Sequence, residues 1–202
     1  MNINSKFDYT IRFALLGDSK VGKTNMITRF VDDVFNLNCS STMGYDCKYK
    51  IITLKKKKVK VMLWDTVGQE KFLAINKAFL QKVDGIMLVY DISELESFQN
   101  MNRWISMIRD YNDKLPTILV GNKKDKEEER IVSEDEGKAL AEKNHMHFFE
   151  TSAYKNINID KAFYDISQKI FDYLMNESKT PSDNFTLDKK KESEKKKKNK
   201  CC

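Results

Sequence analysis

Gly17-Asp18-Ser19-Lys20-Val21-Gly22-Lys23-Thr24 is the stretch that decides the fold, because it fits the phosphate-binding loop pattern G-x-x-x-x-G-K-[ST]. An apolar run leads into it from Ile11, and residues with helical spacing follow from Asn25. Strand, glycine turn and helix is the arrangement that this motif requires. The glycines let successive N–H groups point at phosphate oxygens, and the helix N-terminus adds partial positive charge. We expect Lys23 to reach the β- and γ-phosphates and the Thr24 hydroxyl to bind Mg²⁺.

Apolar runs alternate with helical patterns along the rest of the chain, which is typical of α/β proteins with a parallel sheet. The predicted strands are Thr10–Leu16, Tyr45–Leu54, Val59–Trp64, Gly85–Tyr90, Thr117–Gly121 and His147–Glu150. The predicted helices are Lys23–Val31, Glu96–Tyr111, Ser133–Lys143 and Asn158–Met175. The second and third strands flank four lysines, Lys55 to Lys58, and this spacing indicates a hairpin. We therefore expect a six-stranded, mostly parallel sheet with one antiparallel strand and helices on both faces.

Composition indicates one folded domain over residues 1–176 and a lysine-rich, disordered tail over 177–202. The chain has 202 residues, is 41% hydrophobic and carries a net charge of +6. The tail contains nine lysines and five acidic residues, so most of the positive charge lies outside the predicted domain. This distribution favours an anionic membrane surface and argues against nucleic acid as a partner. Four cysteines without disulfide or zinc spacing, together with no signal peptide or membrane span, predict the reducing cytosol.

Four further stretches follow predicted strands or helices at the edge where α/β sheets bind ligands. Asp65 ends an apolar strand and can hold Mg²⁺ through water, while Gly68 can donate its N–H to a γ-phosphate and Gln69 can orient the attacking water. Thr42, between the first helix and the second strand, can complete the Mg²⁺ shell only when a γ-phosphate is present. This predicts a segment that reports the state of the nucleotide.

The remaining two stretches indicate which nucleotide base the site binds. Asp125, in Gly121-Asn122-Lys123-Lys124-Asp125, can accept hydrogen bonds from N1–H and the exocyclic amine of guanine. Adenine lacks both donors, and a desolvated, unpaired carboxylate discriminates by several orders of magnitude. In Glu150-Thr151-Ser152-Ala153-Tyr154, the Ala153 N–H can reach guanine O6 and Ser152 can brace the loop. The sequence thus favours guanine over the alternative, an adenine-nucleotide enzyme.

With these motifs in one order, the chain resembles a Ras-superfamily small GTPase with a P-loop GTPase fold, and within that group the Rab family of membrane-traffic switches. The resemblance covers Tyr9 to about Met175 and resumes at Cys201-Cys202. It implies binding of GTP or GDP with Mg²⁺, slow intrinsic hydrolysis and acceleration by a GTPase-activating protein. It further implies a monomer that works with exchange factors, effectors, and Rab escort and GDP-dissociation-inhibitor chaperones, on the cytoplasmic face of intracellular membranes.

The resemblance also assigns residues by position. The expected nucleotide contacts are Gly17, Asp18, Ser19, Lys20, Val21, Gly22, Lys23, Thr24, Asn25, Phe35, Thr42, Asp65, Gly68, Asn122, Lys123, Asp125, Ser152, Ala153 and Tyr154, with Gln69 as the catalytic residue. Phe35 is expected to lean on the guanine. Cys201 and Cys202 match a double-cysteine prenylation site. Two lipid chains attached there would anchor the protein stably to a membrane. Phe185-Thr186-Leu187 resembles the tail motif that docks on the chaperones.

Several positions depart from the family pattern. Val67 replaces alanine beside the γ-phosphate, Cys39 replaces a tyrosine of the first switch, and Tyr154 replaces a lysine over the base. Cys47 and Phe79 replace the Phe and Tyr that form, with Trp64, the aromatic effector surface. Two alternatives therefore stay open: a switch that hydrolyses GTP, or a membrane-bound scaffold that hardly hydrolyses it. The hairpin lysines likewise leave open a solvated tip or a second membrane contact.

Overall fold

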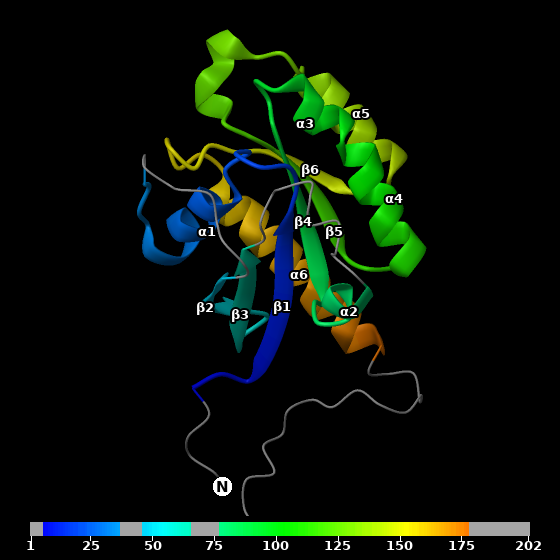
Figure 1. Ribbon diagram of the computed structural model, residues 1–202. Coiled ribbons are helices and arrows are strands. Elements are labelled where there is room, and N and C mark those ends of the chain that lie inside the picture. The colour runs from blue at the N-terminus through cyan, green and yellow to red at the C-terminus, as the bar shows by residue number, and fades with distance from the viewer. Residues whose placement is uncertain (1–5, 37–45, 66–76, 178–202) are drawn as a thin grey trace, which may run out of the picture.

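Six strands form one sheet in the order β2-β3-β1-β4-β5-β6 (Figure 1). This computed structural model describes residues 6–36, 46–65 and 77–177. The strands are β1 (Tyr9–Leu16), β2 (Asp46–Leu54), β3 (Lys57–Asp65), β4 (Gly85–Asp91), β5 (Thr117–Asn122) and β6 (His147–Glu150). All neighbouring strands run parallel except β2, which pairs antiparallel with β3. The predicted sheet is confirmed.

The helices cover both faces of this sheet. They are α1 (Lys23–Asp32), α2 (Lys77–Leu80), α3 (Leu95–Gln99), α4 (Met101–Tyr111), the 3₁₀ helix η2 (Lys124–Glu129), α5 (Glu134–Lys143) and α6 (Ile159–Glu177). Apolar residues of α1 and α6 build one core cluster with alternate residues of the strands, and those of α2, α4 and α5 build the other. No helix in the described ranges combines the length and the apolar content needed to cross a bilayer.

Sequence periodicity located most helices, and the amphipathic prediction for α6 is confirmed by its buried face, Ile159, Ala162, Phe163, Ile166 and Ile170. The Ser133–Glu136 capping box also forms at the start of α5. The prediction of one helix over Glu96–Tyr111 is wrong, because the helix is interrupted at Asn100. The Asn100 side chain donates a hydrogen bond to a carboxylate 82 residues earlier in the chain. The short α2 and η2 carry too little periodicity to be predicted.

The β2–β3 hairpin is tighter than its run of four lysines suggested. Leu54 pairs with Lys57, so only Lys55 and Lys56 form the loop, while Lys57 and Lys58 belong to β3. Lys55 and Lys56 have φ angles of 46° and 65°. Positive φ at both central residues is what a two-residue type I′ turn requires. The nine residues of β3 then extend for about 30 Å, so that the strand ends on the side of the sheet opposite the hairpin turn.

Candidate nucleotide-binding site

The phosphate-binding loop follows β1, at the point where the chain leaves the sheet with β3 on one side and β4 on the other. Gly17 and Gly22 have φ angles of 144° and 99°. A Cβ atom on Gly17 would lie 2.0 Å from the Val89 carbonyl oxygen, and one on Gly22 would lie 2.4 Å from Asn122 Nδ2. The two glycines are therefore required both by backbone conformation and by the close approach of β4 and β5. Lys20, with φ 65°, holds an exposed cation on the same loop.

Lys23 begins α1 and folds back over this loop. Its Nζ donates to the carbonyl oxygens of Gly17 at 2.8 Å and Asp18 at 2.6 Å, and the residue is 5% exposed. Burial lowers the pKa of Lys23 to about 8, against the opposing effect of the Asp65 and Asp18 carboxylates. A buried ammonium at a helix N-terminus is stabilised by an anion. The loop is thus built to gain from a bound phosphate.

Thr24 and Asp65 meet beside this lysine. The Thr24 hydroxyl donates to Asp65 Oδ2 at 2.7 Å, which joins the first turn of α1 to the end of β3. Asp65 is 5% exposed. Hydroxyl and carboxylate oxygens are the ligands that Mg²⁺ takes beside phosphates, so these residues fit a magnesium ion. The predicted third contributor, Thr42, lies outside the described residues, as do Gly68 and Gln69.

The Asp18 carboxylate is held by residues of the other layer of helices. Its carboxylate accepts hydrogen bonds from Asn100 Nδ2 at 2.7 Å and from Trp104 Nε1 at 3.1 Å. The break between α3 and α4 therefore coincides with a contact to the phosphate loop. Sequence reasoning missed Asn100 and Trp104, since neither belongs to a recognisable motif. On this side, the loop is tied to α4.

The loops expected to read the base are brought together at the ends of β5 and β6. Ser152 Oγ donates to Asp125 Oδ1 at 2.5 Å and accepts from the Lys155 N–H at 2.9 Å. Asn122, 1% exposed, donates from Nδ2 to the Val21 carbonyl at 2.8 Å and accepts from the Thr151 hydroxyl at 3.1 Å. Asn122 thus connects the phosphate loop to both base loops, while Ser152 sets the position of the Asp125 carboxylate.

Lys123 and Ala153 are each held by a residue for which the sequence predicted no role in the site. Lys123 Nζ lies 2.6 Å from Asp91 Oδ2, at the end of β4. Asp91 is a polar residue that ends a buried strand, which is the same signal that marked Asp65. Arg29, on α1, donates from Nε to the Ala153 carbonyl at 2.9 Å. No pattern in the sequence marked Arg29, because its partner lies 124 residues away.

Two aromatic rings and an amide pair mark the rim of this site. Phe35 and Tyr154 make an edge-to-face contact, with centroids 5.2 Å apart. Tyr154 remains 55% exposed, so its ring is available above the base loops. Asn25 Nδ2 donates to the Asn36 carbonyl at 3.1 Å and fixes the chain just after Phe35. Phe35 and Tyr154, expected near the base for separate reasons, are therefore neighbours.

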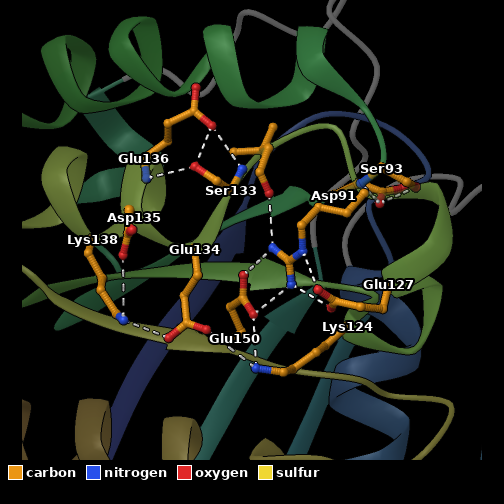
Figure 2. A network of polar contacts seen from close by, with 12 residues as sticks. Asp91, Ser93, Lys124, Glu127, Ser133, Glu134, Asp135, Glu136, Lys138 and Glu150 are labelled. Carbon is orange, nitrogen blue, oxygen red and sulfur yellow. Dashed lines mark hydrogen bonds and ion pairs between the residues drawn. The ribbon is translucent and has the colours of Figure 1, made fainter.

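A network of charged side chains connects residues that flank the two base loops, and Figure 2 shows Lys124, Glu127 and Glu150 of this network. Glu150, at the end of β6, accepts from Arg130 Nη1 at 2.6 Å and Nη2 at 3.0 Å, and lies 3.0 Å from Lys124 Nζ. Glu127 binds the other side of the same guanidinium through two hydrogen bonds. Both carboxylates raise the pKa of Arg130, with Glu150 the larger cause. Lys124 belongs to the loop of Asp125, and Glu150 precedes the loop of Ser152, so the network joins the two.

The three residues predicted for the effector surface lie next to one another in the structure. Cys47 pairs with Trp64 across β2 and β3, and the ring of Trp64 meets that of Phe79 edge to face at 6.5 Å. Cys47 is exposed, whereas Phe79 is 8% exposed. Exchange of a phenyl ring for a thiol at residue 47 leaves less aromatic area on this face. Cys39, Val67, the 185–187 segment, Cys201 and Cys202 lie outside the described residues.

The sequence of the chain is similar to those of known proteins. A sequence model of the Ras family matches residues 12–172. Ras-related protein Rab-10 of Diplobatis ommata is 43% identical over 165 residues, which cover 81% of this chain and 82% of that protein. Ras-related protein RGP2 of Oryza sativa subsp. japonica is 41% identical over 170 residues, covering 84% and 78%. Ras-related protein rab-11.1 of Caenorhabditis elegans is 39% identical over 174 residues, covering 86% and 82%. The chain therefore belongs to the Ras family of small GTPases and is of the Rab type.

Proposed function

We propose that this Rab-type GTPase is a GTP/GDP switch for vesicle-mediated transport whose nucleotide is held by the residues described above. The observation that carries the proposal is the convergence of Lys23, Thr24 and Asp65 at one end of the sheet with Asp125 and Ser152 beside them. Phosphoryl transfer depends on positioning and on charge stabilisation. These side chains supply both for a guanine nucleotide.

Each half of the site has a separate task. Lys23 and the N–H groups of the phosphate loop neutralise and orient the β- and γ-phosphates. Thr24 and Asp65 would hold Mg²⁺, which supplies charge neutralisation between the β- and γ-phosphates. Asp125 accepts from the guanine edge in the position that Ser152 gives it. Asn122 keeps the two halves at a fixed separation through Val21 and Thr151.

The catalytic and sensing parts of the proposal rest on sequence position. Gln69 would orient the attacking water, and Thr42 and Gly68 would contact the γ-phosphate, so that the segments around them differ between the GTP and GDP states. An arginine-bearing activator is expected to accelerate hydrolysis by roughly 10³ to 10⁵. Single-turnover hydrolysis with and without such an activator tests this, with Gln69→Ala as the variant that should not respond.

Base recognition has a sharper test, because Asp125 can be replaced by a residue of the same size that still forms hydrogen bonds. Asp125→Asn replaces one acceptor by a donor, which suits the 2-oxo group of xanthine in place of the 2-amino group of guanine. We expect this variant to lose GDP and gain xanthosine diphosphate, while Asp125→Ala loses both. Competition binding with GDP, xanthosine diphosphate and ADP measures the exchange. Retention of GDP by Asp125→Asn would contradict the assignment of the base loop.

Membrane attachment is the last part of the proposal. Prenylation of both Cys201 and Cys202 would anchor the chain stably, because two lipid chains bind a membrane firmly whereas one binds it only marginally. The tail lysines would add attraction to anionic lipid. Exchange factors, a GTPase-activating protein, effectors and the escort and GDP-dissociation-inhibitor chaperones are the partners expected of such a cycle. Mass spectrometry of the carboxyl-terminal peptide from the native membrane fraction tests it, and unmodified cysteines there would contradict the anchor.

The alternative of a hydrolysis-impaired scaffold is not favoured, because the relatives that share most of the chain are Rab-type GTPases. Its motivation was Val67, whose two extra methyl groups replace alanine next to the γ-phosphate. Single-turnover hydrolysis by Val67→Ala separates the two. An ordinary basal rate that the substitution leaves unchanged removes the scaffold from consideration.

A further inference from the structure

We infer that the turn of the β2–β3 hairpin is a second membrane contact, at which Lys56, Lys57 and Lys58 bind the headgroups of anionic lipids. The inference rests on the proposed membrane attachment of the chain and adds to it the surface of the folded domain that meets the bilayer.

The hairpin carries exposed positive charge that the fold does not neutralise. Lys55 to Lys58 are all exposed. Lys55 Nζ lies 2.5 Å from Asp172 Oδ1 on α6. Among the ion pairs of the described residues, none involves Lys56, Lys57 or Lys58. The Asp8 carboxylate accepts a hydrogen bond from the Lys58 backbone N–H at 2.7 Å and forms no ion pair with the side chains of these described lysines. An acidic surface is therefore the partner that this turn complements in charge.

Lysine is also the wrong residue type for the conformation of this turn. Lys55 and Lys56 have positive φ, where a Cβ atom crowds the following carbonyl and where Asn-Gly is the preferred pair. Neither side chain is buried, so packing does not compensate for the strain. The fold alone would favour other residues at both positions. Strain that the fold does not require is a reason to assign the residues a function.

The turn lies where a membrane contact leaves the nucleotide site accessible. The turn comes immediately before β3, and Asp65 ends the same strand about 30 Å away. The phosphate and base loops lie at that end of the strands, next to Asp65. The contact between Lys55 and Asp172 places the turn beside the last part of α6, the helix after which the lysine-rich tail begins. Figure 1 shows the end of α6 and the start of β1 at one end of the domain, and β1 runs away from that end toward the loop that precedes α1.

The tail can bring the turn to the bilayer that holds Cys201 and Cys202. Twenty-five residues follow Glu177, and a chain of that length spans at most about 85 Å. An anchored chain therefore confines the end of α6 to within that distance of the lipid surface, and the turn lies beside this part of α6. Contact by the turn then becomes an intramolecular step, for which even a weak site is sufficient. The tail and the turn together would orient the domain with its nucleotide loops away from the membrane.

The test uses the full-length, unlipidated chain with bound GDP and vesicles of phosphatidylcholine, with and without phosphatidylserine. The hairpin variant carries Lys56→Gln, Lys57→Gln and Lys58→Gln. The control removes the same charge elsewhere, through Lys138→Gln, Lys143→Gln and Lys161→Gln. Lys138 and Lys143 lie on α5, which packs on β5 and β6 at the sheet edge opposite β2. Vesicle sedimentation at several salt concentrations gives the partition coefficients, and GDP content and the thermal midpoint report folding.

Each lysine near an anionic surface contributes about fivefold to partitioning, so we expect the hairpin variant to bind phosphatidylserine vesicles roughly 10- to 100-fold less tightly than wild type. The control should stay within about twofold, and the difference should shrink as salt screens it. Equal binding by the hairpin and control variants overturns the inference, as does failure of the wild type to prefer phosphatidylserine. If the hairpin variant folds poorly, Lys55→Asn with Lys56→Gly removes two charges in a conformation that suits the turn. Lipidation plays no part in this assay, so a failed anchor and a failed hairpin contact give separate results.

Discussion

Removal of the charge of Glu150 provides the most direct test of how the base loops are positioned. Glu150→Gln keeps the shape of the side chain but takes away the carboxylate that Arg130 and Lys124 share. The Glu150 side chain is 2% exposed and that of Arg130 is 16% exposed. A matched control exists within the same network, because Glu127 also forms a bidentate pair with Arg130 while its side chain is 62% exposed. The two substitutions therefore remove similar hydrogen bonds in different environments (Figure 2).

The expected cost follows from burial. Loss of one partner from a buried pair costs about 3–5 kcal/mol, and we reduce this to about 2–3 kcal/mol because Arg130 keeps Glu127 and is partly solvated. In a chain of this size that lowers the thermal midpoint by roughly 4–12 °C. Glu127→Gln should change the midpoint little, because solvent screens an exposed pair. Unfolding must be followed at a fixed excess of GDP, since bound nucleotide itself stabilises the folded state.

The rate of nucleotide release shows whether Glu150 positions the base loops or only stabilises the folded chain. Glu150 precedes the loop of Ser152 and Ala153, and its partner Lys124 belongs to the loop of Asp125. If half of the lost free energy belongs to the positioning of these loops, release of a fluorescent GDP analogue accelerates about tenfold in Glu150→Gln. Equal midpoints for the two variants would refute the role of burial. A lowered midpoint with unchanged release would refute the role of the network in the base site.

Three further predictions concern the phosphate loop and the hairpin. Burial lowers the pKa of Lys23 to about 8 when no nucleotide is bound, and a bound phosphate favours the charged form of this lysine. GDP affinity should therefore be constant below pH 7 and fall roughly tenfold per pH unit above 8. Association and dissociation rates measured across this range check it, and a flat profile would contradict it. Asn100→Ala should speed GDP release, since Asp18 then loses its hydrogen bond of 2.7 Å; stopped-flow exchange compares it with Asn102→Ala, an exposed neighbour. Lys55→Asn with Lys56→Gly should raise the unfolding free energy by about 1 kcal/mol in urea titrations through relief of positive-φ strain, whereas Lys57→Asn with Lys58→Gly in β3 should lower it.

Local patterns predicted the parts of this molecule whose cause is local. The phosphate loop was found because its glycines must adopt positive φ next to a strand and a helix, and both requirements leave a mark within a few residues. The hairpin and α6 were found because their periodicities of two and about 3.6 residues are written along the chain. The single predicted helix over Glu96–Tyr111 is interrupted at Asn100, whose side chain binds Asp18, a residue distant in sequence.

The positioning of the site came from contacts that no local pattern records. Asn122 was expected at the base, but the tertiary structure shows its carboxamide bonded to Val21 and Thr151. No role in the site was expected for Arg29, Asp91 or Trp104, although each holds a residue of the site.

The sequence by itself determined the class of the fold, the chemistry of the loops and the base that they suit, because each motif encodes its own backbone geometry. The tertiary structure decided which side chains hold those loops in place and put the hairpin turn beside the last part of α6. The physical reason is that strand order and register bring together loops separated by dozens of residues. The energy of those contacts depends on distance in space and on burial, and neither quantity is present in the order of the residues.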